Sequence, residues 1–209
     1  GLEHHSNIVP WQLLCEQAGA KLEFVPVLED GTLDLEEAAR LLGAGGVKLF
    51  AFGHVSNALG TVNPVQKLAA MAHENGALAL VDGAQAVPHL AVDVQEIGAD
   101  FYALSGHKMY GPTGAGALWG KAEHLEAMPP WQGGGDMIRS VSFEGTTFAE
   151  PPFRFEAGTP NISGIVGMGA AAAFLEETGL PAVAEHEAGL VRQAVELLEE
   201  MDGVTLIGT

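Results

Sequence analysis

Short runs of apolar residues alternate along the chain with segments whose apolar positions recur at helical spacing. The short runs are typical of buried strands, and the segments between them are typical of amphipathic helices. This alternation predicts parallel βαβ units and argues against an all-β fold or a helical bundle. We therefore expect an α/β fold with three layers, in which helices flank a mostly parallel sheet. The predicted strands are residues 21–27, 47–52, 77–81, 101–104 and 115–119, and the predicted helices are residues 7–18, 35–42, 64–75, 165–174 and 183–201.

Helix boundary signals support this division. Pro10 falls in the first turn of the first predicted helix, and Asp34 stands where an N-cap is expected for the second. Residues 131–152 are long, rich in glycine and proline, and poor in periodicity. A segment of this kind predicts a loop, and loops of such length in compact domains are usually functional or disordered.

The charge balance restricts the partners of the protein. The formal net charge is -18, from 27 acidic residues against 9 lysines and arginines. Binding to nucleic acid needs clustered basic residues, so we expect no nucleic-acid partner. No apolar stretch is long enough to span a bilayer, and no signal peptide begins at Gly1, so we expect no membrane partner.

The single cysteine excludes an internal disulfide framework and favours a reducing compartment, so we expect a cytoplasmic protein. Cys15 stands beside Leu14 in the helix predicted for residues 7–18. A cysteine in such a helix is more often a small buried hydrophobe than a reactive thiol, because activation requires an electropositive and accessible setting. We therefore expect Cys15 to lie in the core.

Candidate chemistry is concentrated at Lys108, which lies within the sequence Ser-Gly-His-Lys-Met-Tyr-Gly-Pro of residues 105–112. This segment directly follows the predicted strand 101–104. A lysine amine at a strand end, among groups that bind anions, suits a Schiff base to pyridoxal phosphate. The alternative is a surface lysine on a glycine-rich loop.

Two further polar residues follow predicted strands. Asp82 comes directly after strand 77–81, and Asn57 lies in the loop after strand 47–52. Ligands in open α/β sheets bind outside the carboxyl ends of the strands, so these residues are expected to face the same site as Lys108. A carboxylate there would keep a pyridoxal ring nitrogen protonated. Singly, Asp82 could be a turn residue and Asn57 a loop cap.

The chain resembles the class V aminotransferase-like, fold-type I pyridoxal phosphate enzymes. Within them it is most similar to the SUF-type cysteine desulfurases and selenocysteine lyases. The similarity rests on five stretches, which follow the order of the family: residues 3–12 (EHHSNIVPWQ), 54–61 (HVSNALGT), 82–85 (DGAQ), 105–108 (SGHK) and 154–161 (RFEAGTPN).

The resemblance implies a role for each residue of one cofactor site. Lys108 would bind pyridoxal phosphate covalently and act in catalysis, and Asp82 would pair with the ring nitrogen. His4 would stack on the ring and also act in catalysis, and Gln85 would donate to the phenolic oxygen. Asn57 would lie between the cofactor and the substrate carboxylate. No metal ligand is implied.

The phosphate group of the cofactor has its own expected ligands. By the resemblance, Ser105 and His107 would bind it within one subunit, and Thr159 would reach the phosphate of the other subunit of a homodimer. The resemblance also favours a functional role near the dimer interface for residues 131–152. The alternative for His4 is a solvated loop histidine, as adjacent His5 could be, and His4 is favoured over His5 for the cofactor.

Family members are roughly twice as long as this chain, so the resemblance implies a fragment. Residues 1–201 would be most of the large domain that binds pyridoxal phosphate, without its N-terminal part. Residues 202–209 would begin the C-terminal small domain, with a first strand at 204–209. The nucleophilic cysteine and the arginine that binds the substrate carboxylate would lie beyond the chain, so the fragment alone is expected to release no sulfur.

The function implied is a cysteine desulfurase that converts L-cysteine to L-alanine and passes sulfur to a SufE-like or SufU-like acceptor for iron–sulfur cluster assembly. Two alternatives within the superfamily stay open, namely a selenocysteine lyase acting on L-selenocysteine and a cysteine sulfinate desulfinase. An inactive protein that binds pyridoxal phosphate is a third. A metal site built from the eight histidines is disfavoured, because no spacing of Cys and His typical of zinc occurs.

Overall fold

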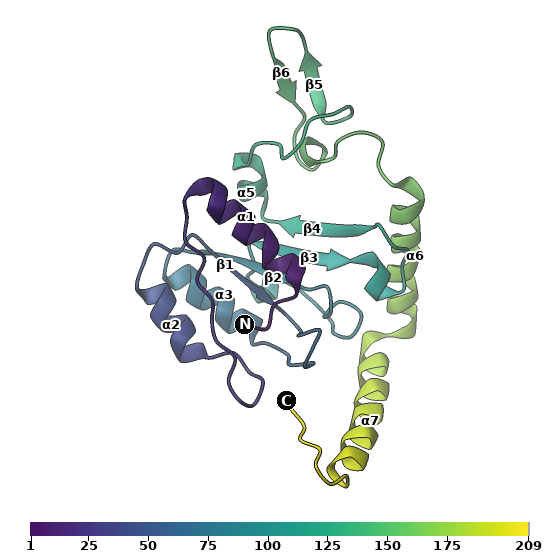
Figure 1. Ribbon diagram of the computed structural model, residues 1–209. Helices are drawn as coiled ribbons and strands as arrows, with labels where there is room; N and C mark the ends of the chain where they lie inside the picture. Colours follow the sequence, from purple (N-terminus) through teal and green to yellow (C-terminus); the bar gives the residue numbers. More distant parts are fainter. Residues whose placement is uncertain (209) are drawn as a thin grey trace.

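The computed structural model describes residues 1–208 and has a four-stranded sheet at its centre, in the order β1, β2, β3, β4 (Figure 1). Three strands run parallel, namely β1 (Leu49–Gly53), β2 (Leu78–Asp82) and β3 (Phe101–Ser105). β4 (Gly116–Gly120) is antiparallel to β3. The carboxyl ends of the three parallel strands therefore meet at one edge of the sheet.

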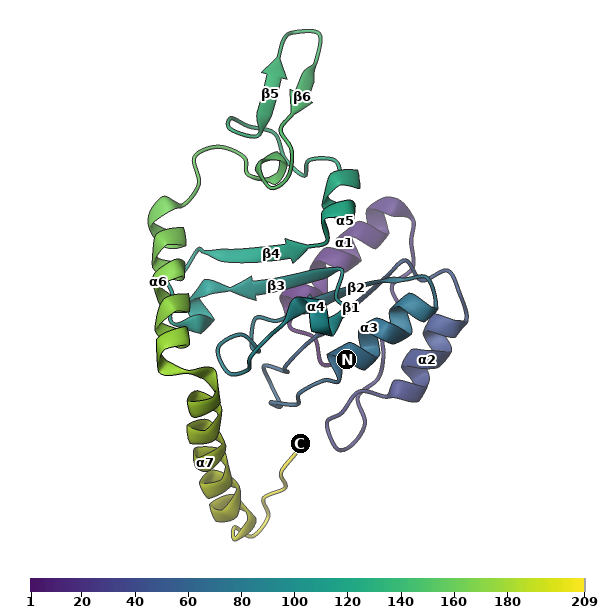
Figure 2. The same ribbon diagram turned by 180° about the vertical axis from the view of Figure 1, so that it is seen from behind.

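Helices lie on both faces of this sheet. α3 (Val65–Glu74) and α4 (Val94–Ile97) lie on one side, with α2 (Leu35–Gly43) next to α3, and α1 (Val9–Ala18) crosses the opposite side (Figures 1 and 2). The expected α/β fold, with helices flanking a mostly parallel sheet, is confirmed.

The second half of the chain leaves the sheet. α5 (Ala122–Ala127) follows β4, and a two-stranded hairpin of β5 (Ile138–Val141) and β6 (Thr146–Phe148) projects from the body of the molecule (Figure 1). α6 (Ile162–Thr178) passes the end of the sheet where β3 stops, and α7 (Leu180–Glu199) continues away from it. Within the described part of the chain, no helix is long and apolar enough to cross a membrane.

The hydrophobic core joins the sheet to α3. Its largest side chains are Phe52, Val81 and Tyr102 from β1, β2 and β3, and Leu68 from α3, all at most 1% exposed. Burial of side chains of this size stabilises a fold by about 1.5–3 kcal/mol each. The core thus fixes the three parallel strands whose ends carry the candidate site.

Side-chain caps mark the starts of two helices. Asp34 Oδ1 accepts a hydrogen bond from the Glu37 N–H at 2.9 Å, and Asn161 Oδ1 accepts one from the Gly164 N–H at 3.0 Å. Each bond satisfies a backbone donor that the first turn leaves free. Pro10 stands in the first turn of α1, as predicted. The five predicted helices are all present, with shifted boundaries.

Residues 21–27 were expected to form a strand, and this prediction is wrong. Only an isolated bridge between Val27 and Leu33 occurs there. Pro26 offers no N–H to a ladder, and Phe24 is largely exposed rather than packed. The apolar alternation of this segment therefore produces extended chain without a paired strand.

The interpretation of residues 131–152 as one irregular loop is also wrong, because the hairpin of β5 and β6 lies inside it. The turn closes through a hydrogen bond from the Ser142 N–H to the Gly145 carbonyl oxygen at 2.9 Å. The hydroxyl groups of Ser140 and Thr147 meet across the strands at 2.6 Å. Val141 and Thr146 form one cross-strand pair of β-branched residues, which are typical of strands.

The strand expected at residues 204–209 does not form over the described residues 204–208. Residues 204–208 are extended but unpaired, and Thr209 lies outside the described residues. Gly208 approaches the Leu59 carbonyl so closely that an added Cβ would lie 2.7 Å from its oxygen. The division of the chain into domains at residues 201 and 202 stays a prediction.

Candidate active site

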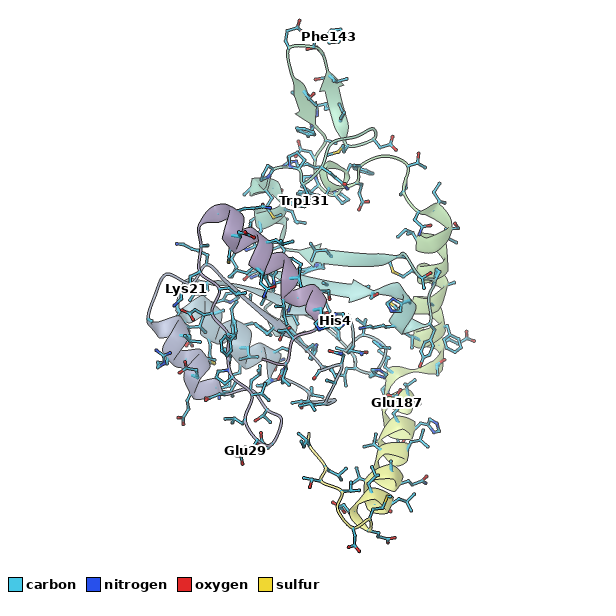
Figure 3. The ribbon with its side chains drawn as sticks, viewed as in Figure 1. His4, Lys21, Glu29, Trp131, Phe143 and Glu187 are labelled. Atoms are coloured by element: carbon cyan, nitrogen blue, oxygen red, sulfur yellow. The ribbon has the colours of Figure 1, made fainter. Side chains whose placement is uncertain are left out.

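The carboxyl ends of the parallel strands open onto one pocket. Five of the residues expected at the cofactor line it, namely His4, Asn57, Asp82, Gln85 and Lys108. The remaining lining residues are Leu2, Glu3, Gly53, Val55 and Ala84. His4 reaches the pocket from the segment before α1 (Figure 3). The predicted convergence of strand ends at a single site is thus confirmed in its geometry.

Lys108 is placed by a short 3-10 helix, η2 (Gly106–Met109), which directly follows β3. η2 packs against α6, where an added Cβ at Gly106 would lie 3.1 Å from Met168 Sδ. The turn closes through the Gly111 N–H, which donates to the Gly106 carbonyl oxygen at 2.8 Å. Lys108 is half-buried, so its amine stands at the pocket on a rigid turn rather than on a free surface loop.

Asp82 is the last residue of β2, and its carboxylate accepts a hydrogen bond from the Ala84 N–H at 3.0 Å. The turn after it is closed by the Ala86 N–H, which donates to the Gly83 carbonyl oxygen at 2.9 Å. This turn carries Gln85 to the same pocket. Asp82 is therefore a turn residue and a pocket residue at once, because a single bond to Ala84 leaves other carboxylate lone pairs free.

A buried pair of polar side chains lies behind Asp82. His54 Nδ1 and Tyr102 Oη are 3.0 Å apart and share a hydrogen bond, and the two residues are 8% and 1% exposed. Burial lowers the pKa of His54. Burial, and then the nearby charge of Asp82, raise the pKa of Tyr102 well above its usual range. Both groups are therefore neutral at pH 7 and act as a hydrogen-bonded packing unit.

Glu3 is a pocket residue to which the sequence assigned no role. Its carboxylate accepts hydrogen bonds from the Gly53 N–H at 2.9 Å and from Asn7 Nδ2 at 2.6 Å. Burial raises the pKa of Glu3, the two hydrogen bonds lower it, and the charge of Asp82 raises it further. Glu3 is the first residue of the stretch EHHSNIVPWQ, so this motif could have indicated that Glu3 lies at the site. The two adjacent histidines are the more obvious candidates for site residues in that motif.

Asn57 sits in the tight loop after β1. Ser56 Oγ accepts hydrogen bonds from the N–H groups of Ala58 and Leu59 at 3.3 and 3.2 Å, and Val55 bridges to Val62. These bonds hold the loop without using the Asn57 side chain, which is exposed at the pocket. Its amide is therefore placed to contact a ligand.

Three expected phosphate ligands lie outside the pocket lining. Ser105 Oγ and His107 Nδ1 are 2.9 Å apart, so they form one hydrogen-bonded pair beside Lys108. Thr159 is exposed in the loop before α6, where Asn161 Nδ2 donates to the Gly114 carbonyl oxygen at 3.1 Å. Their roles at the phosphate stay predictions.

Cys15 does not lie in the core, so that expectation is wrong. It is half-buried on α1, and α1 contributes no fully buried residue in the described part of the chain. Among residues 1–208, no group of three or more His, Cys, Asp or Glu side chains is arranged to hold a metal ion.

The side chains of the pocket fit pyridoxal phosphate by their chemistry. Lys108 offers an amine for a Schiff base, and Asp82 offers a carboxylate for a protonated ring nitrogen. Gln85 has an amide donor, and His4 has a flat ring that can stack. All four groups reach the same pocket, His4 from the segment before α1, Lys108 from η2, and Asp82 and Gln85 from the end of β2 and the turn after it.

Comparison with known proteins assigns the chain to a family. The family profile described as aminotransferase class-V matches residues 1–209, so the chain belongs to this family. Its members use pyridoxal phosphate. The chain is 54% identical over 208 residues to a cysteine desulfurase of Enterobacter sp. (strain 638), and 50% identical over 208 residues to a probable cysteine desulfurase of Xylella fastidiosa (strain 9a5c).

Solved structures agree with this assignment. A cysteine desulfurase from Escherichia coli matches with a TM-score of 0.93 and 40% identity, covering 97% of this chain and 50% of that one. The apo structure of a cysteine desulfurase from Thermococcus onnurineus NA1 matches with a TM-score of 0.93 and 42% identity, covering 99% of this chain and 51% of that one. The fold-type I architecture is thereby confirmed.

The chain spans about half the length of the curated relatives it matches. The alignments cover 99% and 100% of this chain but only 51% and 50% of the Enterobacter and Xylella proteins. The sheet and its pocket therefore correspond to one part of each relative.

Proposed function

We propose that the protein carrying this chain is a cysteine desulfurase dependent on pyridoxal phosphate. It removes sulfur from L-cysteine, gives L-alanine, and keeps the sulfur as an enzyme persulfide for iron–sulfur cluster assembly. The observation that carries the proposal is the pocket in which Lys108 and Asp82 meet from adjacent strand ends. The names of relatives at 50–54% identity support the choice of substrate.

Lys108 and Asp82 have complementary tasks in this function. When bound, the cofactor supplies an electron sink for the carbanion left by removal of the substrate α-proton. Lys108 would hold the cofactor covalently in the resting enzyme and then move the α-proton, because its amine stands at the same pocket as the other groups expected at the cofactor. Asp82 would keep a positive charge on the ring nitrogen by a charge-assisted hydrogen bond.

Three other pocket residues orient the reactants. His4 would stack on the cofactor ring, Gln85 would donate to the phenolic oxygen, and Asn57 would contact the substrate carboxylate. Their positions support these roles, because the three side chains line the same pocket from the start of η1, the Asp82 turn and the β1 loop. Orientation of this kind contributes to rate by holding reacting atoms in a productive geometry.

Phosphate binding involves residues beside the pocket. Ser105 and His107 flank Lys108, and their mutual hydrogen bond preorganises two groups that can donate to an anion. Thr159 binds the phosphate of the second subunit in a homodimer. Its exposure and its position outside the pocket lining of its own chain support a role in trans.

The remaining steps use groups that we do not assign within residues 1–209. A cysteine attacks the substrate sulfur, and an arginine binds the substrate carboxylate as a planar fork. The persulfide passes to a SufE-like or SufU-like acceptor in the cytoplasm.

The test uses a full-length enzyme that carries residues 1–209. Treatment with borohydride in the presence of pyridoxal phosphate should fix a pyridoxyl group on the peptide containing Lys108, and mass spectrometry locates it. The same enzyme should release alanine from L-cysteine faster than from L-cysteine sulfinate, with L-selenocysteine assayed in parallel. Lys108→Ala should lose both the label and the activity.

Lys67→Ala is the matched control, because Lys67 is an exposed lysine that does not line the pocket. It should keep the label at Lys108 and normal alanine release. Labelling at Lys67 or Lys121 in place of Lys108 would contradict the assignment. Faster turnover of cysteine sulfinate than of cysteine would replace the proposed substrate.

A further inference from the structure

Glu3 is a carboxylate in the pocket that the proposed function leaves without a task. Most of its surface is covered, and burial raises its pKa. A charged group in such a place costs free energy unless it is fully hydrogen-bonded. The hydrogen bonds of the Glu3 carboxylate therefore show which parts of the fold it holds together.

Glu3 is the end point of a one-directional chain of hydrogen bonds. Trp11 Nε1 on α1 donates to Asn7 Oδ1 at 2.8 Å, and Asn7 Nδ2 donates to Glu3 Oε2 at 2.6 Å. From the other side, the Gly53 N–H at the end of β1 donates to Glu3 Oε1 at 2.9 Å. The carboxylate thus joins α1 and its preceding turn to a strand of the central sheet.

His4 lies in the middle of this connection. Its carbonyl oxygen accepts from the Asn7 N–H at 2.8 Å, and its Nδ1 accepts from the Ser6 N–H at 3.2 Å and lies 2.8 Å from Ser6 Oγ. These bonds hold His4 within its own turn, η1 (His5–Asn7). The bonds of Glu3 to Asn7 and Gly53 tie that turn to β1.

We propose that Glu3 is a positioning residue that fixes His4 at the pocket by anchoring η1 and α1 to the end of β1. The inference rests on the proposed function only for the statement that His4 contacts the cofactor. The anchoring itself follows from the hydrogen bonds.

The inference is testable because each hydrogen bond in this chain has a defined donor and a defined acceptor, so a substitution can remove one of them. A glutamine at position 3 can accept from the Gly53 N–H, but it then turns its own N–H donors toward Asn7 Nδ2. Asn7 cannot rotate to offer its oxygen without turning its amide toward the donor Trp11 Nε1. Glu3→Gln therefore breaks the chain of bonds.

A second substitution restores the chain with the charge moved to position 7. When Asn7→Asp is added to Glu3→Gln, the new carboxylate at position 7 accepts from the new amide at position 3 and from Trp11 Nε1. Asn7→Asp alone places two carboxylates face to face, so it is expected to impair the anchor as well.

The experiment compares Glu3→Gln, Asn7→Asp and the double variant in a full-length enzyme that carries residues 1–209. Visible circular dichroism of the bound cofactor and its dissociation constant are measured, with kcat and KM for L-cysteine. Glu3→Gln should weaken cofactor binding roughly tenfold or more, as expected for loss of a hydrogen bond to a buried charge. The double variant should recover most of the affinity and of the dichroism.

A second readout does not need the cofactor. In cofactor-free protein labelled with 15N-histidine, the His4 ring signals should shift and broaden in Glu3→Gln and return in the double variant. Failure of the proposed function would appear as wild-type enzyme without a cofactor band, while these signals would still report the anchoring. Glu37→Gln is the control, since Glu37 is a surface carboxylate hydrogen-bonded to Arg40 on the exposed side of α2.

The inference is overturned if Glu3→Gln leaves the His4 signals unchanged, or if the double variant is as impaired as Glu3→Gln. The latter would mean that the charge at position 3, and not the chain of bonds, is what matters. Should Glu3→Gln fail to fold, Trp11→Phe removes the first donor and keeps the carboxylate. It should shift the His4 signals in the same direction by a smaller amount, and unchanged signals would again overturn the inference.

Discussion

The ring of Tyr102 occupies the space that a side chain at Gly83 would need. A Cβ on Gly83 would lie 2.0 Å from Tyr102 Cε1 and 2.2 Å from its Oη. Gly83 directly follows Asp82, and Tyr102 belongs to the neighbouring strand β3. The close approach therefore fixes the backbone that aims Asp82 and Gln85 at the pocket.

Gly83→Ala should displace this backbone. Overpacking of a filled core typically costs about 1–3 kcal/mol, and here the displaced atoms include the turn at Asp82. We expect a similar loss in the free energy of unfolding and weaker binding of pyridoxal phosphate, measured by denaturant titration and absorption. Gly169→Ala on α6 is the control, because its Cβ would meet nothing within 4 Å. Normal cofactor affinity in Gly83→Ala would show that the Asp82 turn is not fixed by Tyr102.

Much of the parallel sheet and of its pocket could be predicted because local signals coincide with the tertiary structure. Runs such as 77–81 and 101–104 are buried strands in the structure, and parallel pairing brings the residues after them to one edge. The cap at Asp34 marks a real helix start. Where the local preferences of the residues and the tertiary fold favour the same element, the sequence predicts that element correctly.

The predictions that were wrong depended on tertiary contacts, which the local sequence does not reveal. Residues 21–27 have the apolar alternation of a strand, but pairing depends on a partner that local sequence does not reveal. Glu3 was overlooked because its importance lies in bonds to Asn7 and to Gly53, and Gly53 is distant in sequence. Cys15 is only half-buried because the face of α1 that carries it is not covered in this structure, where neighbouring Leu14 is also exposed.

The His54–Tyr102 pair predicts a dependence of stability on pH. Burial lowers the pKa of His54 in the folded state below the value of about 6.5 expected when the chain is unfolded. The unfolded state therefore binds the proton more tightly, so stability is full above pH 6.5 and falls as the pH decreases. His54→Gln should flatten the fall in the free energy of unfolding below about pH 6.5 relative to wild type. An unchanged slope would mean that His54 binds its proton equally well in the folded and unfolded states.

Asp100 predicts a second, more acidic transition. It is 2% exposed and accepts bonds from Lys121 Nζ at 2.6 Å and the Ala79 N–H at 2.8 Å, while ring nitrogens of His73 and His124 lie within 2.8 and 3.2 Å. Burial raises the pKa of Asp100, but these partners together hold it well below its usual range. Its stabilisation is therefore present above about pH 4 and is lost as the pH falls below that value.

Asp100→Asn should remove this acid transition and lower the free energy of unfolding at pH 7 by about 1–3 kcal/mol, because the buried hydrogen bonds to the Ala79 N–H and to Lys121 lose their charged acceptor. Denaturant titrations at pH 7 and pH 3 measure both effects. Glu196→Gln, an exposed carboxylate on α7, should change neither. Equal stability of Asp100→Asn and wild type at pH 7 would show that the cluster contributes no net stabilisation.

Cys15 is predicted to be dispensable for sulfur removal. It is half-buried on α1 and does not line the pocket of Lys108. In a full-length enzyme that carries residues 1–209, Cys15→Ala should keep sulfide and alanine release from L-cysteine within about twofold of wild type, since it removes only a small apolar contact. A loss of sulfur release with retained cofactor binding would identify Cys15 as the nucleophile. The isolated 209-residue chain, in turn, should release no alanine.

Mixed dimers test the role of Thr159. If Thr159 completes the phosphate site of the other subunit, a dimer of one Lys108→Ala chain and one Thr159→Ala chain has one site with both lesions and one site with neither. Random mixing gives half heterodimers, so about a quarter of wild-type activity should return, well above that of either variant alone. Unfolding and refolding the two proteins together allows the exchange, and alanine release from L-cysteine measures it.

Ser163→Ala in place of Thr159→Ala is the control for this mixing, because Ser163 lies on the adjacent α6 and is also exposed. That mixture should simply show the activity of its unimpaired Ser163→Ala chains. If the Lys108→Ala and Thr159→Ala mixture shows only the average of its two parents, Thr159 acts within its own subunit or not at the phosphate. The proposed completion of the site across the dimer would then be wrong, because Thr159 is the residue proposed to reach the phosphate of the other subunit.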